Sequence, residues 1–495
     1  MNLNEKTKEN IKVFIGIIFF NSIILANFLK MHYAQDTYCV ISYGYKKISK
    51  VAFLWSGRPI TAIIFYIANF LKLNVETLVG IMSIISLFTL SISVFILYKN
   101  ILKLHKNKKL IELLAVLVIS YITIINFTTM DLLVFVESGV LCIALLLCVL
   151  AACEWLNNPK PKYLKIFILL YIVALCHQAI LNIYVPLGLM FVAFKNKDDV
   201  KKAFREAFLV LLFYGIAIIS GIITSNIINS IFNIGARETI IPSIPFIFET
   251  YGKYLNLMVV ETLGVGPKCW YIVVMSIITA VFLINNIKNK DKKINLFYYT
   301  AILLSAILLP ILPVTMQEKT AQYLEFRMAL SFGASIGIML LYTLLSIKET
   351  TNKIFKFIIA FSCLIFIFNG QYIVKSSGEM VATNLMDRNF AKTIIYNIEQ
   401  YEIKNNTQVK YIAIQCDLEP EFFYDGSEKY RCLNIKSIAT DWDLIEMLEV
   451  FSGRKFEPKK VTEEAYNKYF AGKNWKYFDE EQLVFVDDTL YICIY

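Results

Sequence analysis

Long apolar runs alternate with short polar segments along most of the chain, and this pattern changes near residue 370. Eleven of the runs approach the length of about 20 residues that an α-helix needs to cross a bilayer. We expect transmembrane helices at roughly 11–29, 77–98, 110–127, 131–152, 163–177, 178–194, 207–229, 269–286, 296–315, 329–347 and 354–370. The pattern therefore predicts a polytopic α-helical membrane protein.

One further apolar run, PITAIIFYIANFLKLN at 59–74, is short for a crossing. Its polar positions are spread unevenly around a helix, which is typical of a segment that lies in the headgroup layer. We therefore expect an interfacial helix on the outer surface of the membrane. A twelfth crossing at this position is the alternative.

Lysine and arginine indicate how these helices are oriented. With the N-terminus in the cytoplasm, the short inner segments carry about twice as many lysine and arginine side chains as the longer outer loops. The positive-inside rule then places residues beyond 370 outside the membrane. The net charge of +10 resides largely in these short segments, so nucleic-acid binding is not expected.

The tail beyond residue 370 has mixed charges and two kinds of periodicity. Alternating stretches such as VKYIAIQC and LVFVDDTLYICIY predict strands, whereas NFAKTIIYNIEQY and DWDLIEMLEVF predict helices. We therefore expect a transmembrane domain at 1–370 and a small extracytoplasmic α/β domain at 371–495. About 125 residues are enough for a separate hydrophobic core.

Polar surface on the outer side is expected in the tail and in the loops 30–58, 230–268 and 316–328. The inner side carries no glycine-rich phosphate-binding motif, so we expect the chemistry on the outer face. Asp36 follows the first run by a few residues, and a carboxylate there is a candidate general base. A solvated acid that caps a helix together with Thr37 is the alternative.

Two arginines on the outer side are candidate phosphate ligands. Arg58 ends the first loop, and Arg327 begins a later helix with Glu325 beside it as a second candidate acid. A planar guanidinium suits bidentate contact with phosphate. Anchoring of these side chains among lipid headgroups is the alternative.

Further polar candidates fall near the outer ends of the predicted helices. Glu137 is expected about two turns below the outer surface, Asp131 at that surface, and His177 and Gln178 in a tight outer turn. An ionisable group inside the membrane is a functional hypothesis by default, with a neutral or paired structural role for Glu137 as the alternative. The turn residues can bind hydroxyls or satisfy the backbone of the turn. No second histidine or cysteine cluster accompanies them, so a metal site is not expected.

These features together resemble the GT-C class of membrane glycosyltransferases. More narrowly, the chain is similar to the bacterial glucosyl transferase II family, a membrane group that includes serotype-converting O-antigen glucosyltransferases. The likeness rests on DTY at 36–38, WSGRP at 55–59, ESG at 137–139, HQAILNIY at 177–184 and DRNFAKTII at 387–395. Many GT-C enzymes carry paired acids in the first outer loop, whereas residues 31–58 contain only Asp36. The identity of a second acid, with Asp131 as one candidate, stays open.

The resemblance implies transfer of a hexose, glucose by analogy, from a polyprenyl-phosphate donor to a surface glycan such as O-antigen, teichoic acid or capsule. It implies Asp36 as the base, Arg58 and Arg327 as ligands of the lipid phosphate, and Gln178 as the safer match of the HQ pair. Such chemistry requires no cofactor, and a divalent metal stays open. The expected location is the bacterial cytoplasmic membrane. A flippase for lipid-linked polysaccharide and a polysaccharide polymerase or ligase are the alternatives.

Overall fold

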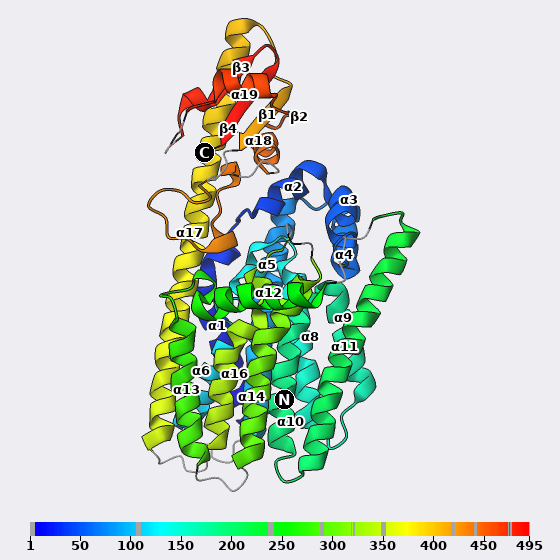
Figure 1. Ribbon diagram of the computed structural model, residues 1–495, viewed down its shortest axis with the longest axis vertical. Helices are drawn as coiled ribbons and strands as arrows, with labels where there is room; N and C mark the ends of the chain where they lie inside the picture. Colours follow the sequence, from blue (N-terminus) through cyan, green and yellow to red (C-terminus); the bar gives the residue numbers. More distant parts are fainter. Residues whose placement is uncertain are drawn as a thin grey trace.

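The computed structural model describes residues 5–104, 110–235, 242–287, 292–317, 319, 322–347, 353–416, 421–439, 443–473, 475 and 478–494. Parts of the lysine-rich segments expected on the inner side, at 105–109, 288–291 and 348–352, lie outside these ranges. The described chain is mostly helical. Its helices form a long bundle with a small sheet beyond one end, which we call the sheet end (Figure 1).

Each of the eleven predicted apolar runs contains a helix of the bundle. The helices are α1 (Glu5–Ile24), α5 (Val75–Leu104), α6 (Leu110–Ile124), α8 (Ser138–Asn157), α9 (Tyr163–Cys176), α10 (Tyr184–Lys195), α11 (Val200–Ile231), α13 (Trp270–Asn286), α14 (Lys292–Leu308), α16 (Leu330–Ser346) and α17 (Lys353–Asn405). Within the described ranges, six helical stretches are both long and apolar enough to cross a membrane. The structure is therefore compatible with the prediction of a helical membrane protein.

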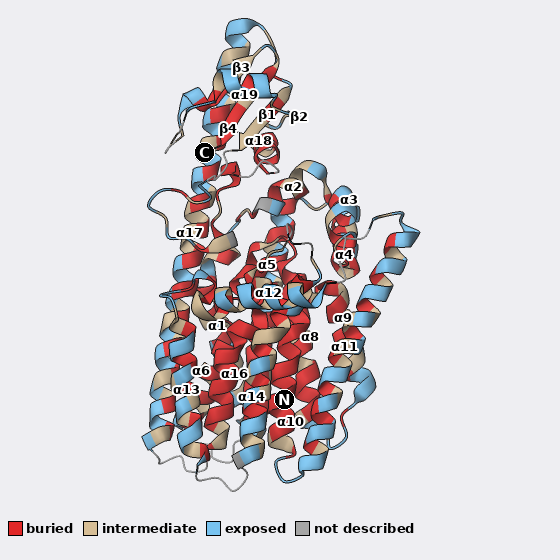
Figure 2. Cartoon of the chain, viewed as in Figure 1, coloured by how far each residue is buried: buried red, intermediate tan, exposed pale blue. Residues whose placement is uncertain are grey.

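The centre of the bundle is buried, whereas its outer helices expose apolar side chains (Figure 2). On α11 the exposed apolar residues include Phe208, Ile219, Ile223 and Ile227. A large exposed apolar face is unfavourable in water and favourable against lipid. The burial pattern thus agrees with a membrane location for the bundle.

Small residues allow several helices of the bundle to approach closely. A Cβ atom added at Gly337 of α16 would lie only 2.6 Å from the backbone nitrogen of Thr123 on α6. A Cβ at Gly221 of α11 would lie 2.7 Å from the Cβ of Ala174 on α9. Close backbone approach of this kind is how helices associate where water provides no hydrophobic drive.

Short helices cover the sheet end of the bundle. They are α2 (Gln35–Tyr43), α3 (Tyr45–Ile48), α4 (Pro59–Phe70), α7 (Met130–Val134), α12 (Ile244–Leu255) and α15 (Leu312–Thr315), with the π-helical segment η2 (Ser49–Leu54) between α3 and α4. Helix α12 runs across the bundle axis, and α2 lies between the bundle and the sheet (Figure 1).

Helix α4, the predicted interfacial segment, stays at the sheet end and does not run through the bundle (Figure 1). Its Thr61 hydroxyl donates to the carbonyl of Cys176 at the end of α9, at 3.4 Å. The opposite side of the segment exposes Ile63, Ile67, Phe70 and Leu71. The structure therefore agrees with the expectation that 59–74 adds no further helix to the bundle.

The predicted run 131–152 is not one helix. It consists of α7 and α8 with a break at 135–137, and Glu137 precedes the first residue of α8. Glu137 is therefore at a helix start near the sheet end, and not two turns inside a continuous helix as expected. Asp131, expected at the membrane surface, is fully buried.

The C-terminal unit contains a four-stranded sheet of order β2-β1-β4-β3. Strand β1 (Tyr411–Cys416) pairs in parallel with β2 (Glu457–Lys459) and β4 (Thr489–Ile494), and β3 (Leu483–Val486) forms an antiparallel hairpin with β4. Helices α18 (Leu444–Ser452) and α19 (Glu463–Tyr469) complete the unit. The strands predicted from alternation in the tail are thus present.

The boundary expected at residue 370 is not a break in the chain. Helix α17 is continuous over 53 residues and carries the chain from the bundle to the sheet. Its last turns, with Ile394 and Ile398, join the hydrophobic core of the sheet unit.

Candidate active site

Asp36 lies in the first turn of α2, between the bundle and the sheet unit. A carboxylate is favourable there because the helix start carries a partial positive charge. The side chain that caps this start is Thr37, whose Oγ1 accepts the backbone N–H of Ala34 at 3.0 Å. Solvent reaches the Asp36 side chain, so its carboxylate is accessible to a ligand.

Arg58 is fixed at the start of α4 by the turn that precedes it. Gly57 has a φ of +76° and a Cβ there would lie 3.2 Å from Nε2 of Gln178, so the turn suits glycine. The carbonyl of Gly57 accepts the Ser225 hydroxyl of α11 at 3.2 Å. Nη1 of Arg58 lies 3.7 Å from Oε1 of Glu137. The first loop therefore contacts the bundle and places the Arg58 guanidinium next to Glu137.

Arg327 lies in the 3₁₀ segment η8 (Phe326–Met328) and is held by Asp131 of α7. Oδ2 of Asp131 accepts the backbone N–H of Arg327 at 2.8 Å and lies 3.5 Å from its Nη1. The guanidinium carbon also lies 4.3 Å from the centre of the Phe135 ring, in cation–π contact. Asp131 thus positions Arg327.

The two arginines and Asp36 form one electrostatic cluster. Although Asp36 is exposed on one side, desolvation by the surrounding protein raises the pKa of its carboxyl, the positive charges of Arg327 and Arg58 oppose that rise, and Asp131 adds to it. The net effect is a pKa above the ordinary aspartate value, which makes Asp36 a stronger base than a fully solvated aspartate. Glu137 interacts electrostatically with the same three groups.

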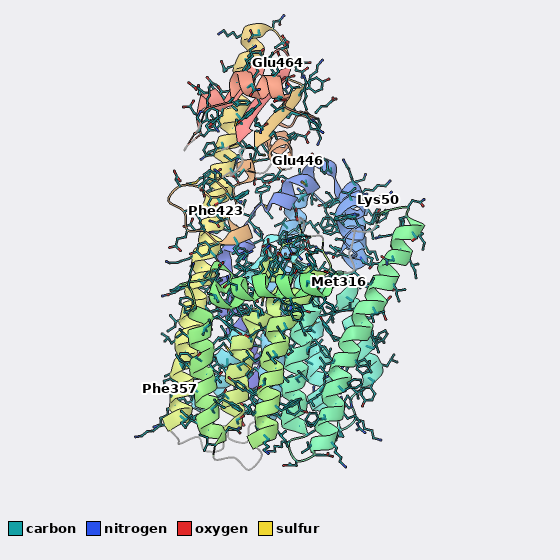
Figure 3. All side chains as sticks on the ribbon, in the orientation of Figure 1. Lys50, Met316, Phe357, Phe423, Glu446 and Glu464 are labelled. Carbon is teal, nitrogen blue, oxygen red and sulfur yellow. The ribbon has the colours of Figure 1, made fainter. Side chains whose placement is uncertain are left out.

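A cavity of about 370 Å³ opens beside this cluster. Arg58 and Arg327 line it together with His177 and Gln178, which lie at the turn between α9 and the 3₁₀ segment η3 (Gln178–Ile183). Met316, also in the wall, lies beside α12 (Figure 3). The predicted turn at 177–178 is therefore part of the candidate site.

Glu325, a further predicted site residue, lies two positions before Arg327. It precedes η8, and its backbone carbonyl accepts the N–H of Met328 at 3.0 Å. Its charge acts on Tyr254 of α12.

The sheet unit holds α2 from the side opposite the bundle. Tyr38 belongs to the hydrophobic core of the sheet unit and stacks on Tyr33 at 5.0 Å between ring centres. The Ser42 and Tyr43 hydroxyls donate to the carboxylates of Glu449 and Glu446 on α18. Glu446 lies where α18 faces α2 (Figure 3). The helix that carries Asp36 is thereby shared between both parts of the molecule.

No protein-family model, curated protein or solved structure matches this chain. Among the described residues, no group of three or more histidine, cysteine, aspartate or glutamate side chains is arranged to hold a metal ion.

The sequence reasoning missed the polar side chains that line the cavity from η3 and α11. Asn182 and Tyr214 are paired there, with the tyrosine hydroxyl donating to the asparagine Oδ1 at 2.7 Å, and Ser225 and Asn229 line the wall. A signal was present in the sequence. Ser225 and Asn229 are four residues apart in a run that is apolar up to residue 219, which places them on one face of the helix.

Proposed function

We propose that the protein transfers a hexose, glucose by resemblance, from a polyprenyl-phosphate donor to a surface glycan on the outer face of the membrane. The observation that carries this proposal is the convergence of Asp36 with Arg58 and Arg327 beside a cavity. Asp36 and Arg58 come from the first loop, whereas Arg327 comes from a segment far along the chain. A carboxylate base next to two cations is the set that transfer from a glycosyl phosphate requires.

The two arginines supply the phosphate site in this proposal. Each is oriented by an acid, Arg58 by Glu137 and Arg327 by Asp131, and both line the cavity. Negative charge grows on the phosphate as its bond to the sugar breaks. Fixed guanidinium groups stabilise that charge without reorganisation, which lowers the barrier.

Asp36 acts as the general base. Its carboxylate takes the proton of the acceptor hydroxyl while the acceptor oxygen attacks the anomeric carbon. The bond between that carbon and the phosphate oxygen breaks, and polyprenyl phosphate leaves with the electron pair. A single displacement of this kind inverts the anomeric centre.

The proposal places the sheet end outside the cell and the N-terminus in the cytoplasm, with the bundle in a bacterial cytoplasmic membrane. Eleven crossings and an interfacial α4 are part of this proposal. The exposed apolar faces of α11 and α4 provide the lipid contact through which a polyprenyl chain reaches the cavity.

The test is transfer of labelled glucose from synthetic polyprenyl-phosphate glucose by the purified full chain, with O-antigen, teichoic acid and capsule glycans offered as acceptors. We expect wild type to transfer and Asp36→Asn to lose at least a hundredfold in rate, as is common for removal of a general base. Asp425→Asn, an exposed acid of the C-terminal unit, is the matched control. Equal turnover by wild type and Asp36→Asn would remove the base assignment, and no transfer with any hexose would favour a flippase.

A further inference from the structure

The cavity beside the arginines contains more buried polar side chains than a lipid-binding pocket needs. His177, Asn182 and Asn229 all line it, and their exposed fractions are 5%, 1% and 4%. His177 immediately precedes η3, Asn182 lies within it and Asn229 lies on α11, and all three are buried in the protein interior. Polar groups buried in such surroundings are costly unless they find hydrogen-bond partners.

Several polar atoms of these side chains lack such partners. Among the described residues, none hydrogen-bonds Nδ1 or Nε2 of His177, Nδ2 of Asn182 or Oδ1 of Asn229. The Tyr214 hydroxyl already donates to Oδ1 of Asn182, which leaves the amide N–H groups of that side chain as donors. Unsatisfied buried groups are rare in folded proteins, and their gathering in one cavity points to a ligand.

The types of unsatisfied atom define the ligand. A neutral imidazole offers one donor and one acceptor, Asn182 adds donors and Asn229 adds an acceptor. A hydrocarbon chain can satisfy none of them, and a phosphate only accepts. Sugar hydroxyls both donate and accept, so they match the whole set. The volume of about 370 Å³ lies in the range of small-molecule sites.

We propose that this cavity is the hexose subsite of the donor, in which His177, Asn182 and Asn229 hydrogen-bond the sugar hydroxyls. The inference rests on the proposed function and deepens it by placing the sugar next to the phosphate held by Arg58 and Arg327. These three side chains determine which hexose is accepted, because a misplaced hydroxyl leaves buried polar atoms unpaired.

The experiment measures the affinity of the purified full chain for sugar-free polyprenyl phosphate and for the same lipid carrying glucose, galactose or mannose. We expect wild type to bind one sugar-loaded lipid more tightly than the sugar-free lipid. His177→Phe and Asn229→Leu weaken binding of that lipid by about three- to tenfold each, the value of one lost hydrogen bond, and leave the sugar-free lipid unchanged.

Two controls separate recognition from folding. Ser230→Ala alters an exposed hydroxyl next to Asn229 on the same helix and leaves both affinities unchanged. His177→Gln keeps a donor and an acceptor and retains most of the preference for the sugar-loaded lipid. Equal weakening of both lipids by His177→Phe and Asn229→Leu, or tighter binding of the sugar-free lipid, overturns the subsite. If the wild-type protein binds none of the three sugar-loaded lipids more tightly than the sugar-free lipid, the subsite is overturned as well.

The subsite and the proposed function fail in different ways. Loss of the sugar preference in these variants, together with full transfer by Asp36→Asn, supports the subsite and removes the catalytic assignment. Loss of transfer in Asp36→Asn, together with an unchanged sugar preference in His177→Phe and Asn229→Leu, supports the catalytic assignment and removes the subsite.

Discussion

A single carboxylate oxygen of Asp131 contacts Arg327 twice, accepting its backbone N–H at 2.8 Å and facing its Nη1 at 3.5 Å. The two residues are 196 positions apart in the sequence. Because both the backbone and the head of the arginine are engaged, the position of the guanidinium depends on a buried acid of another helix. Asp131 is therefore a positioning residue for the phosphate site.

Asp131→Asn should weaken this arrangement while keeping an acceptor for the backbone N–H. Loss of the charge-assisted contact costs about 1.5–3 kcal/mol, which corresponds to roughly ten- to a hundredfold in transfer rate if the contact is fully lost in the transition state. The measurement is the rate of glucose transfer at saturating donor, with thermal unfolding as a control for folding. An unchanged rate would show that Arg327 needs no support from Asp131.

The pH dependence of transfer should report Asp36. Its pKa lies above the ordinary value because desolvation by the surrounding protein outweighs the opposing arginine charges. The base is active only when ionised, so the rate rises with pH and the acid limb lies above about pH 4. The measurement is the pH profile of the rate at subsaturating donor. A profile whose acid limb falls at or below the ordinary aspartate pKa contradicts the raised value.

Asp36→Asn should stabilise the fold at neutral pH. A carboxyl whose pKa is higher in the folded than in the unfolded state contributes its stability fully below the unfolded pKa, and loses it as the pH rises through the folded pKa. Removal of the charge therefore raises the unfolding temperature at pH 7 and has little effect near pH 4. Thermal unfolding of both proteins at the two pH values tests this. A lower unfolding temperature for the variant at pH 7 would contradict it.

Gly57→Ala should impair the site more than Gly44→Ala does. Both glycines have positive φ values, +76° and +77°, so both variants carry backbone strain. Only at position 57 does an added Cβ meet other groups, Gln178 Nε2 at 3.2 Å and Ser225 Oγ at 3.6 Å, whereas nothing lies within 4 Å at position 44. We expect a fall of at least fivefold in donor affinity for Gly57→Ala relative to Gly44→Ala. Equal effects would mean that the contact between the first loop and η3 has no role.

The proposed orientation predicts which cysteine substitutions react from outside the cell. Glu464→Cys on α19, labelled in Figure 3, should react with a membrane-impermeant thiol reagent in intact cells. Lys162→Cys, between α8 and α9 at the other end of the bundle, should react only after permeabilisation. Both side chains are exposed, so the difference reports the membrane and not burial. The native chain supplies the background labelling, and the reverse pattern would invert the topology.

The elements of the fold were largely predictable because their signals are local. Apolar runs gave the positions of the bundle helices, and alternation gave strands β1, β3 and β4. The break before Ser138 was not predictable, because 131–137 is apolar apart from its acids and contains no glycine or proline. The continuity of α17 through residue 370 was missed for a related reason. Polar residues after a crossing suggest a boundary, yet a solvated helix tolerates them.

The individual residues of the candidate site could be predicted from the sequence, but their arrangement around a cavity could not. Asp36, Arg58, Glu137, Asp131, Gln178 and Arg327 were singled out from charge and position, and the structure brings them together. The cavity itself depends on contacts between Gly57, Gln178 and Ser225, which no single-sequence pattern reveals. Glu325 was chosen for its closeness in sequence to Arg327, and its charge acts on Tyr254 of α12.

Helix α17 couples the two parts of the molecule mechanically. At 1.5 Å per residue its 53 residues span about 80 Å, from the far end of the bundle into the core of the sheet unit. A continuous helix of this length is a rigid spacer that fixes the distance between the bundle and the sheet unit. Because the sheet unit also contacts α2 through Ser42 and Tyr43, the same spacer sets where the carboxylate of Asp36 is held above the bundle.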